Sequence, residues 1–395
     1  MQDSWLSDGA GRELDAIKVA IDAELRAQIV KLEADGPDRA HPLMFRIYRW
    51  FRHYLDSSGR RMHGLAVVLS YRACGGCDLA RIYPVAAAFQ LYHHHTLVHD
   101  DIYDEDDLRR GWPTTHRAFA AYLEGAGNGS NIAPARSNGD LFATEALRRG
   151  TIAAFAYGKI GRALAAHMIG EAAFPAPAVL DVMQALNWHD VFDNAGQLKD
   201  VHDEGAMLPA PQACLENAWL KTGRLFEVCA YAGARLASGT ESQTAALKTW
   251  AGLSGLAYQL QDDVEDLVAE SEKGQGRGAG RDVRQLKPTY VRAIAGTLAT
   301  GADAALLAGW RGGGDDEQDV TRLIEVLDRC GATAAVRQKV AEVVGEAKRP
   351  LAVATPEFDG SDVSLMGSFT DYFVSPQYWR RSIGRHEADA AALMA

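Results

Sequence analysis

The sequence has little of what a membrane, secreted or nucleic-acid-binding protein requires. No apolar stretch approaches the roughly 18 residues that a transmembrane helix needs, and the N-terminus is polar and acidic, unlike a secretory signal. The five cysteines are an odd number in a chain of 395 residues, which argues against a disulfide framework. Basic residues form no dense cluster and the formal net charge is -11, so nucleic acid is not an expected partner. We expect a cytoplasmic protein with no transmembrane segment.

Alternating runs of β-branched residues are also nearly absent, which argues against a β-sheet fold. Long segments rich in Ala, Leu and Val instead place apolar residues at helical spacing. The predicted fold class is therefore all-α, a single large helical bundle. Helices are predicted over residues 12–34, 41–55, 62–74, 79–104, 114–124, 140–169, 176–196, 212–237, 241–269, 287–298, 317–329 and 333–347.

The loops between these helices lack the composition of a domain linker, and the sequence has no repeat of fixed period. We expect one all-α domain over residues 1–349. The segment 350–395 mixes Pro, Gly and Asp with aromatic residues between Phe369 and Trp379, and we expect this C-terminal tail to cap the body.

A first aspartate cluster lies in LVHDDIYDEDDLRRG, residues 97–111, at the end of a predicted helix. Asp100 and Asp104 are four residues apart, so their carboxylates project from one face, one turn apart. Such like charges repel each other, and a hard divalent cation that prefers oxygen ligands compensates for the repulsion. Acidic pairs with this spacing are also common on solvated helix faces, so this cluster alone leaves both interpretations open.

A second cluster, QLQDDVEDL at residues 259–267, repeats the spacing with Asp262, Asp263 and Asp266. The run that precedes it, AGLSGLAYQL, is almost uncharged, so a solvated surface explains these acids less well. Two matching clusters on different helices predict a shared set of Mg²⁺ ions, held between facing carboxylates and bridged to the phosphate oxygens of a substrate.

Basic side chains that could hold a diphosphate stand near both clusters. Each one alone could be a solvated surface charge, but their recurrence beside acidic or glycine-marked positions indicates one anion-binding pocket. They are Arg109, Arg110, Lys199, Lys221 and Lys287. The glycine-rich GQGRGAG follows a predicted helix and no strand, so it is expected to be a flexible flap and not a dinucleotide-binding loop.

Taken together, these motifs resemble the trans-isoprenyl diphosphate synthases, the polyprenyl synthetase family, over roughly residues 40 to 300. DDIYD followed by RRG is similar to the family's first aspartate-rich motif, and GLAYQLQDDVED is similar to the second. GQLKD, KTG and the Lys-Pro-Thr at 287–289 are similar to its other landmarks. The resemblance implies an all-α homodimer with a deep central cavity, in which an allylic diphosphate is ionised, condensed with isopentenyl diphosphate and deprotonated.

The resemblance also implies roles for individual residues. The metal ligands for Mg²⁺ would be Asp100 and Asp104 for two ions and Asp262 for a third, supported by Asp266. The allylic diphosphate would be bound by Arg109, Lys221 and Lys287. Isopentenyl diphosphate would be bound by Arg60, His93 and Arg110, with His63 in the same acceptor segment. The oxygens of Thr222 and Gln259 would face the developing cation.

The sequence departs from the family pattern in the acceptor segment. The family usually has GGKRLRP, whereas residues 58–64 read SGRRMHG, so His63 stands in place of the second phosphate-binding arginine. Acceptor affinity and acceptor identity are therefore open. A lysine expected shortly before Asp282 is also missing, and a longer polar loop occupies residues 124–138.

Side chains below the first cluster on the same helix face are expected to form the floor of the hydrocarbon tunnel. They are Thr96, His95, Tyr92 and Phe89. Because Thr96 is small and the two large rings lie deeper, a short-chain product is predicted, with C20 geranylgeranyl diphosphate favoured over C15 farnesyl diphosphate. The alternatives are a class I terpene cyclase, a prenyltransferase with an unusual acceptor on the same fold, and a regulatory partner subunit.

Overall fold

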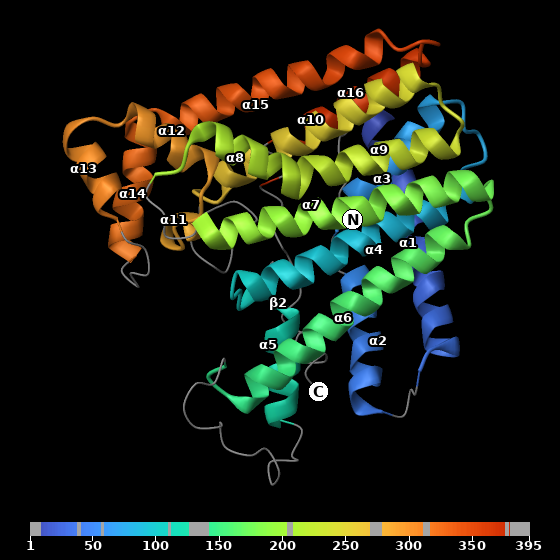
Figure 1. The fold of residues 1–395 in the computed structure, drawn as a ribbon, viewed down its shortest axis with the longest axis horizontal. Coiled ribbons are helices and arrows are strands. Elements are labelled where there is room, and N and C mark those ends of the chain that lie inside the picture. The colour runs from blue at the N-terminus through green and yellow to red at the C-terminus, as the bar shows by residue number, and fades with distance from the viewer. Residues whose placement is uncertain are drawn as a thin grey trace. The chain divides into compact units, whose positions relative to one another are not determined.

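The computed structural model describes residues 9–37, 41–56, 59–109, 112–125, 142–203, 208–268, 279–310, 317–375 and 379. These residues form α-helices almost throughout, with a single two-stranded hairpin among them (Figure 1), which confirms the predicted all-α class. Among the described helices, none combines the length and hydropathy that crossing a membrane requires.

The helices in the first half of the described chain are α1 (Gly9–Asp35), α2 (Pro42–Asp56), α3 (Met62–Ala73), α4 (Leu79–Tyr103), α5 (Thr115–Gly125), α6 (Glu145–Gly170) and α7 (Ala176–Asp203). The hairpin is β1 (Leu108–Arg109) and β2 (Trp112–Pro113). The later elements are α8 (Pro211–Ala218), the π-helical turn η1 (Trp219–Gly223), α9 (Arg224–Leu236), α10 (Glu241–Glu265), α11 (Arg281–Arg284), α12 (Tyr290–Leu298), α13 (Gly301–Gly309), α14 (Glu317–Arg329), α15 (Ala332–Lys348), the 3-10 turn η2 (Arg349–Ala352) and α16 (Gly360–Phe373).

The chain divides into two compact units, and each is described by itself. Among the described residues, the first unit contains 9–15, 66–82 and the segments between 174 and 379. The second unit contains the described residues of 16–65 and 83–173.

Helix α10 is the centre of the first unit. It begins with a capping box, in which Thr240 accepts from the Gln243 backbone N–H and the Gln243 side chain accepts from the Thr240 N–H. It packs against α9 on one side and α15 on another (Figure 1). The approach to α9 is close, since a Cβ added at Gly255 would lie 2.7 Å from the Phe226 ring and 3.0 Å from the Gly223 Cα. This packing fixes the end of α10, where the second aspartate cluster lies.

The core of the first unit is built mainly from aliphatic side chains of α10, α12, α14 and α15. Its buried members include Leu260, Val264, Val291, Leu323, Val326, Leu327, Val336, Val340 and Val343. Along α10, α14 and α15 these residues recur at intervals of three and four, with Val326 and Leu327 adjacent, which is the pattern that the sequence predicts for one buried face.

The C-terminal segment contributes a helix that the sequence analysis did not predict. Helix α16 packs against α10 and α15, and the Trp250 indole N–H donates to the Thr370 hydroxyl over 2.9 Å. Trp379 is buried, stacks on Tyr258 with ring centroids 5.3 Å apart and donates to the Phe373 carbonyl. Aromatic contacts of this kind bury large apolar surfaces, so residues 360–375 and Trp379 form part of the core of this unit.

In the second unit, α5 and α6 lie side by side with little room between them (Figure 1). A Cβ added at Gly150 of α6 would lie 2.6 Å from the His116 carbonyl oxygen, so glycine is needed for this approach. The part of α4 in this unit is apolar and fully buried from Val85 to Phe89. It ends at the first aspartate cluster.

Several predicted elements differ from the observed ones. The single helix predicted over 212–237 is interrupted by the π-helical turn η1, and the helix predicted from 287 begins at Tyr290. Helix α13 and the hairpin were not predicted. Most of the polar loop at 124–138, the flap up to residue 278 and Arg110 lie outside the described residues.

Candidate active site

The first aspartate cluster stands where α4 ends and the chain turns back. Asp100 is half-buried, Asp101 is buried, and the Asp104 N–H donates to the Asp100 carbonyl over 2.8 Å, which continues the helical bonding just past Tyr103. Glu105 has a φ of 51°, in the left-handed region that non-glycine residues rarely adopt. This turn leads into the β1–β2 hairpin.

The hairpin places Arg109 beside the first aspartate cluster. The Arg109 Nε donates to Asp101 Oδ1 over 2.6 Å. Burial by itself lowers the pKa of the Arg109 guanidinium, but Asp101, then Asp100 and Asp104, more than offset this effect, so the pKa is raised. Arg109 therefore lies within the electrostatic field of all three carboxylates. It is a fixed cation beside oxygen ligands of the kind that Mg²⁺ prefers.

Below the cluster on α4 lie the side chains predicted to line a tunnel floor. Phe89 and Tyr92 are fully buried, and His95 is 5% exposed. A His95 ring nitrogen lies 2.6 Å from the Tyr92 carbonyl oxygen, and the two rings meet edge to face. Thr96 donates to the His93 carbonyl over 2.9 Å. The large rings are therefore held in place by packing, and the smallest of the four side chains is the one nearest Asp100.

The structure brings together two of the acceptor-site candidates. His63, at the start of α3, and His93, on α4, have ring centroids 4.0 Å apart. Arg60 and His63 are buried, and His93 is half-buried. Nothing in the local sequence predicts the pairing of His63 with His93, because 30 residues separate them.

The second aspartate cluster lies at the end of α10, and its three acids have different surroundings. Asp263 is buried and accepts from the Tyr290 backbone N–H over 3.1 Å at the start of α12. Asp266 is buried and accepts from the Asp282 N–H over 3.0 Å at the start of α11. Asp262 is half-buried, with the Gln259 amide 3.4 Å away. Two of the three carboxylates thus satisfy backbone donors at helix starts.

The π-helical turn η1 carries the Lys-Thr-Gly motif. Lys221 Nζ donates to Asp200 Oδ2 over 2.5 Å, and Asn217 donates to the other oxygen of the same carboxylate. The Thr222 hydroxyl donates to the Gln259 side-chain oxygen over 2.7 Å. π-Helical turns are rare and occur frequently at functional sites. Here the turn joins Thr222 directly to the helix that carries the second cluster.

Lys287 lies close to the same cluster. Its ammonium is 3.8 Å from Asp282 Oδ1, and Asp282 is itself bound to Asp266 through its backbone. The Lys287 side chain is 25% exposed, so it keeps access to solvent. No role was predicted for Asp101 or Asp200 from the sequence, although Asp101 lies within DDIYD and Asp200 within GQLKD.

The two clusters belong to different units, so their predicted meeting across a cavity stays a prediction. Within the described residues, no group of three or more His, Cys, Asp or Glu side chains is arranged so that it could coordinate a metal ion by itself. Mg²⁺ is usually held by one or two carboxylates together with waters and substrate phosphates. The carboxylates of Asp100, Asp104 and Asp262 fit that mode of binding.

Comparisons with known proteins agree with the motifs. Residues 45–327 match the family model for polyprenyl synthetase. Over 246 residues the chain is 31% identical to a short chain isoprenyl diphosphate synthase of Methanocaldococcus jannaschii, which covers 62% of this chain and 65% of that relative. It is 26% identical to a geranylgeranyl diphosphate synthase of Methanosarcina mazei, over 84% of this chain and 90% of that relative.

A solved structure has a similar fold. The geranylgeranyl pyrophosphate synthase of Corynebacterium glutamicum, crystallised with isoprenyl diphosphate and magnesium, superposes with a TM-score of 0.81 at 21% identity. The alignment covers 93% of this chain and 99% of that chain.

Proposed function

Because the chain belongs to the polyprenyl synthetase family and is a prenyltransferase of the isoprenyl diphosphate synthase type, we propose that it condenses an allylic diphosphate with isopentenyl diphosphate to give a short-chain product. C20 geranylgeranyl diphosphate is the favoured product and C15 farnesyl diphosphate the next. The observation that carries the proposal is that each aspartate cluster, at the ends of α4 and α10, has a basic side chain close to it. Arg109 donates to Asp101 in the first cluster, and Lys287 lies 3.8 Å from Asp282, whose N–H donates to Asp266 of the second.

We propose that Asp100 and Asp104 bind two Mg²⁺ ions and Asp262 a third, with Asp266 holding the end of α10 in place. When bound, Mg²⁺ neutralises charge on the departing diphosphate. Arg109, Lys221 and Lys287 would bind the same diphosphate through their fixed positive charges. No other cofactor is required by this chemistry.

The reaction breaks one carbon–oxygen bond and forms one carbon–carbon bond. The diphosphate leaves with the bonding electron pair, and the allylic cation is attacked by the double bond of isopentenyl diphosphate. A proton is then lost to the released diphosphate, which regenerates a double bond. We propose that the hydrogen-bonded Thr222 and Gln259 direct oxygen atoms toward the cation, since preorganised dipoles stabilise charge as it develops.

We propose that Phe89 and Tyr92, with His95 beside them, limit the length of the product. Both rings are fully buried and fixed by packing, so a growing chain cannot displace them without disturbing the core. Thr96 leaves room directly below Asp100. These two properties together favour a C20 product over a longer one.

We also propose that the protein forms a homodimer through α7. Exposed apolar side chains follow one another along this helix, and each is more than half exposed: Leu180, Trp188, Val191, Leu198 and Val201. From Trp188 to Val201 these residues are separated by three, seven and three positions. This is the spacing of apolar residues at a helix–helix interface. A second copy of the chain would cover this stripe with the same stripe about a two-fold axis. Sedimentation of wild type and Leu198→Glu tests the proposal, since a dimer that uses this face becomes a monomer in the variant.

His63 occurs where an arginine is usual, and its ring lies 4.0 Å from the His93 ring in a tilted contact. This favours one alternative, a prenyltransferase with an unusual acceptor. One experiment separates the candidates. The purified chain is incubated with Mg²⁺, labelled isopentenyl diphosphate and dimethylallyl, geranyl or farnesyl diphosphate. Label in a longer prenyl diphosphate supports the proposed function. Turnover of the allylic substrate without label incorporation contradicts it and indicates a cyclase or a different acceptor, and no turnover indicates a regulatory subunit.

A further inference from the structure

A fully buried arginine lies in the middle of the acceptor segment. Arg61 follows Arg60 directly and precedes His63 by two residues, and its side chain is 1% exposed. Its backbone φ is 56°, in the left-handed region that costs free energy for a residue with a side chain. Such strain persists only where surrounding contacts hold the residue in place, so the contacts of the side chain need to be identified.

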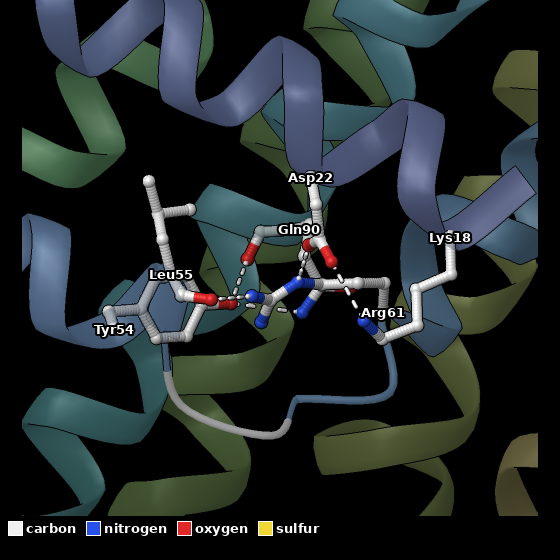
Figure 2. Close-up of polar contacts among 6 residues, drawn as sticks. All are labelled: Lys18, Asp22, Tyr54, Leu55, Arg61 and Gln90. Atoms are coloured by element: carbon white, nitrogen blue, oxygen red, sulfur yellow. Dashed lines mark hydrogen bonds and ion pairs between the residues drawn. The ribbon is translucent and has the colours of Figure 1, made fainter. Parts of the chain in front are cut away.

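The Arg61 guanidinium joins three segments of the second unit (Figure 2). Its Nε donates to Asp22 Oδ1 of α1 over 2.5 Å, and its Nη2 donates to the Leu55 carbonyl at the end of α2 over 3.0 Å. The guanidinium also lies 4.9 Å from the ring centroid of Tyr54, within the range of a cation–π interaction. A Cβ at Gly59 would overlap the guanidinium, so the segment is built around this side chain.

The charge on Arg61 is retained in spite of its burial. Burial lowers the pKa of the guanidinium, but Tyr54 and Asp22 more than offset this effect and the pKa is raised. A buried charge of this kind is stable only while its partner remains in place. Asp22 also accepts from Lys18 over 2.7 Å, and Lys18 is 25% exposed.

The same contacts continue to α4, which carries His93. The Tyr54 hydroxyl and the Gln90 side-chain amide are hydrogen-bonded over 3.1 Å (Figure 2), and the Tyr54 ring stacks on His94 with centroids 3.6 Å apart. Gln90 is three residues from His93 and therefore lies next to it on the helix surface. Arg61 is thus connected to the segments on both sides of the His63–His93 pair.

From these contacts we infer that Arg61, held by Asp22, is a positioning residue for isopentenyl diphosphate. This inference rests on the proposed function. Arg61 is too deeply buried to touch the substrate itself. It holds the strained turn that places Arg60 and His63, and through Tyr54 it fixes that turn relative to the part of α4 that carries His93. Groups that bind a diphosphate must be placed accurately, because a displacement of about 1 Å can cost about two orders of magnitude in rate.

The test compares the two substrates of one enzyme. In Arg61→Lys the charge remains but the forked geometry is lost, so the KM for isopentenyl diphosphate is expected to rise by about tenfold or more, with the KM for the allylic diphosphate changed by less than about twofold. Asp22→Asn removes the partner charge and is expected to act in the same direction. If either variant fails to fold, Tyr54→Phe deletes only one hydroxyl and is expected to raise the same KM by a smaller factor.

Two controls separate positioning from general destabilisation. Lys18→Met removes the other cation on Asp22 and is expected to leave both KM values unchanged. Arg72→Met breaks ion pairs to Glu13 and Asp362 in the first unit. This variant shows what a lower melting temperature alone does to the two KM values. The inference is overturned if Arg61→Lys raises both KM values equally, changes neither, or does no more than Arg72→Met at the same loss of melting temperature. If the wild-type chain itself makes no product from isopentenyl diphosphate, the proposed function fails, and the inference fails with it.

Discussion

The second aspartate cluster allows two neighbouring carboxylates to be distinguished by experiment. Asp263 is buried and accepts from the Tyr290 N–H over 3.1 Å and from the Gln259 amide over 3.1 Å. Asp262 is half-buried and is the proposed Mg²⁺ ligand. We predict that Asp263→Ala destabilises the protein, whereas Asp262→Ala removes activity with little effect on stability.

The magnitude follows from the contacts of Asp263. Removing an acceptor leaves the buried Tyr290 N–H unsatisfied, which costs about 1–3 kcal/mol. Loss of a negative charge at the start of α12 costs about 0.3–1 kcal/mol more. Asp263→Ala should therefore lower the free energy of unfolding by about 1–4 kcal/mol. Asp263→Asn keeps an acceptor oxygen, so its free energy of unfolding should lie between that of Asp263→Ala and that of the wild type.

Asp262→Ala is the matched control on the same turn of helix. Its removal relieves repulsion between neighbouring carboxylates, so the change in stability should stay within about 0.5 kcal/mol. Loss of a group that stabilises developing charge typically lowers kcat by about 10²- to 10³-fold, and that loss is expected here in assays with Mg²⁺ and both substrates.

Denaturant unfolding gives the shift in midpoint, and amide hydrogen exchange across residues 290–293 reports on α12 itself. The local measurement is needed because a chain with two compact units need not unfold in a single step. Asp263→Ala should accelerate exchange at the start of α12, and Asp262→Ala should not. The reasoning is refuted if Asp263→Ala leaves both the midpoint and the exchange unchanged, or if the two variants lose equal stability.

Three further predictions concern other residues. Tyr92→Ala should yield products longer than the wild type does in chain-length analysis, together with about 3 kcal/mol of lost stability from truncating a buried ring; unchanged product length would rule out this floor. Thr222→Val removes the hydrogen bond to Gln259, so kcat should fall with little change in either KM; a rise in KM at constant kcat would instead indicate a role in ground-state binding. Burial, and to a smaller extent the nearby His93, lowers the pKa of His94 well below its ordinary value of 6.5. The unfolded chain therefore binds this proton more readily than the folded chain, and the free energy of unfolding should fall as pH drops below 6.5. His94→Gln should flatten this dependence in melting curves from pH 7 to 5, and the same change at the exposed His167 should not.

The helices and the aspartate spacing could be read from the sequence, because both depend on residues three or four positions apart. The periodicity of α10, α14 and α15 predicts their buried faces without knowledge of their partners. Asp100 with Asp104, and Asp262 with Asp266, are separated by one helical turn wherever the helix lies. The expected ends of most helices agree with the structure within a few residues, since caps and glycines mark them locally.

What each polar residue contacts was decided by the tertiary structure. The sequence places Arg61 between two proposed substrate ligands, but its ion pair with Asp22, 39 residues away, forms only when α1 packs on this segment. The same holds for His63 beside His93 and for Thr222 beside Gln259. These pairs meet only when separate helices pack, and no local periodicity encodes the distance between two side chains on different helices.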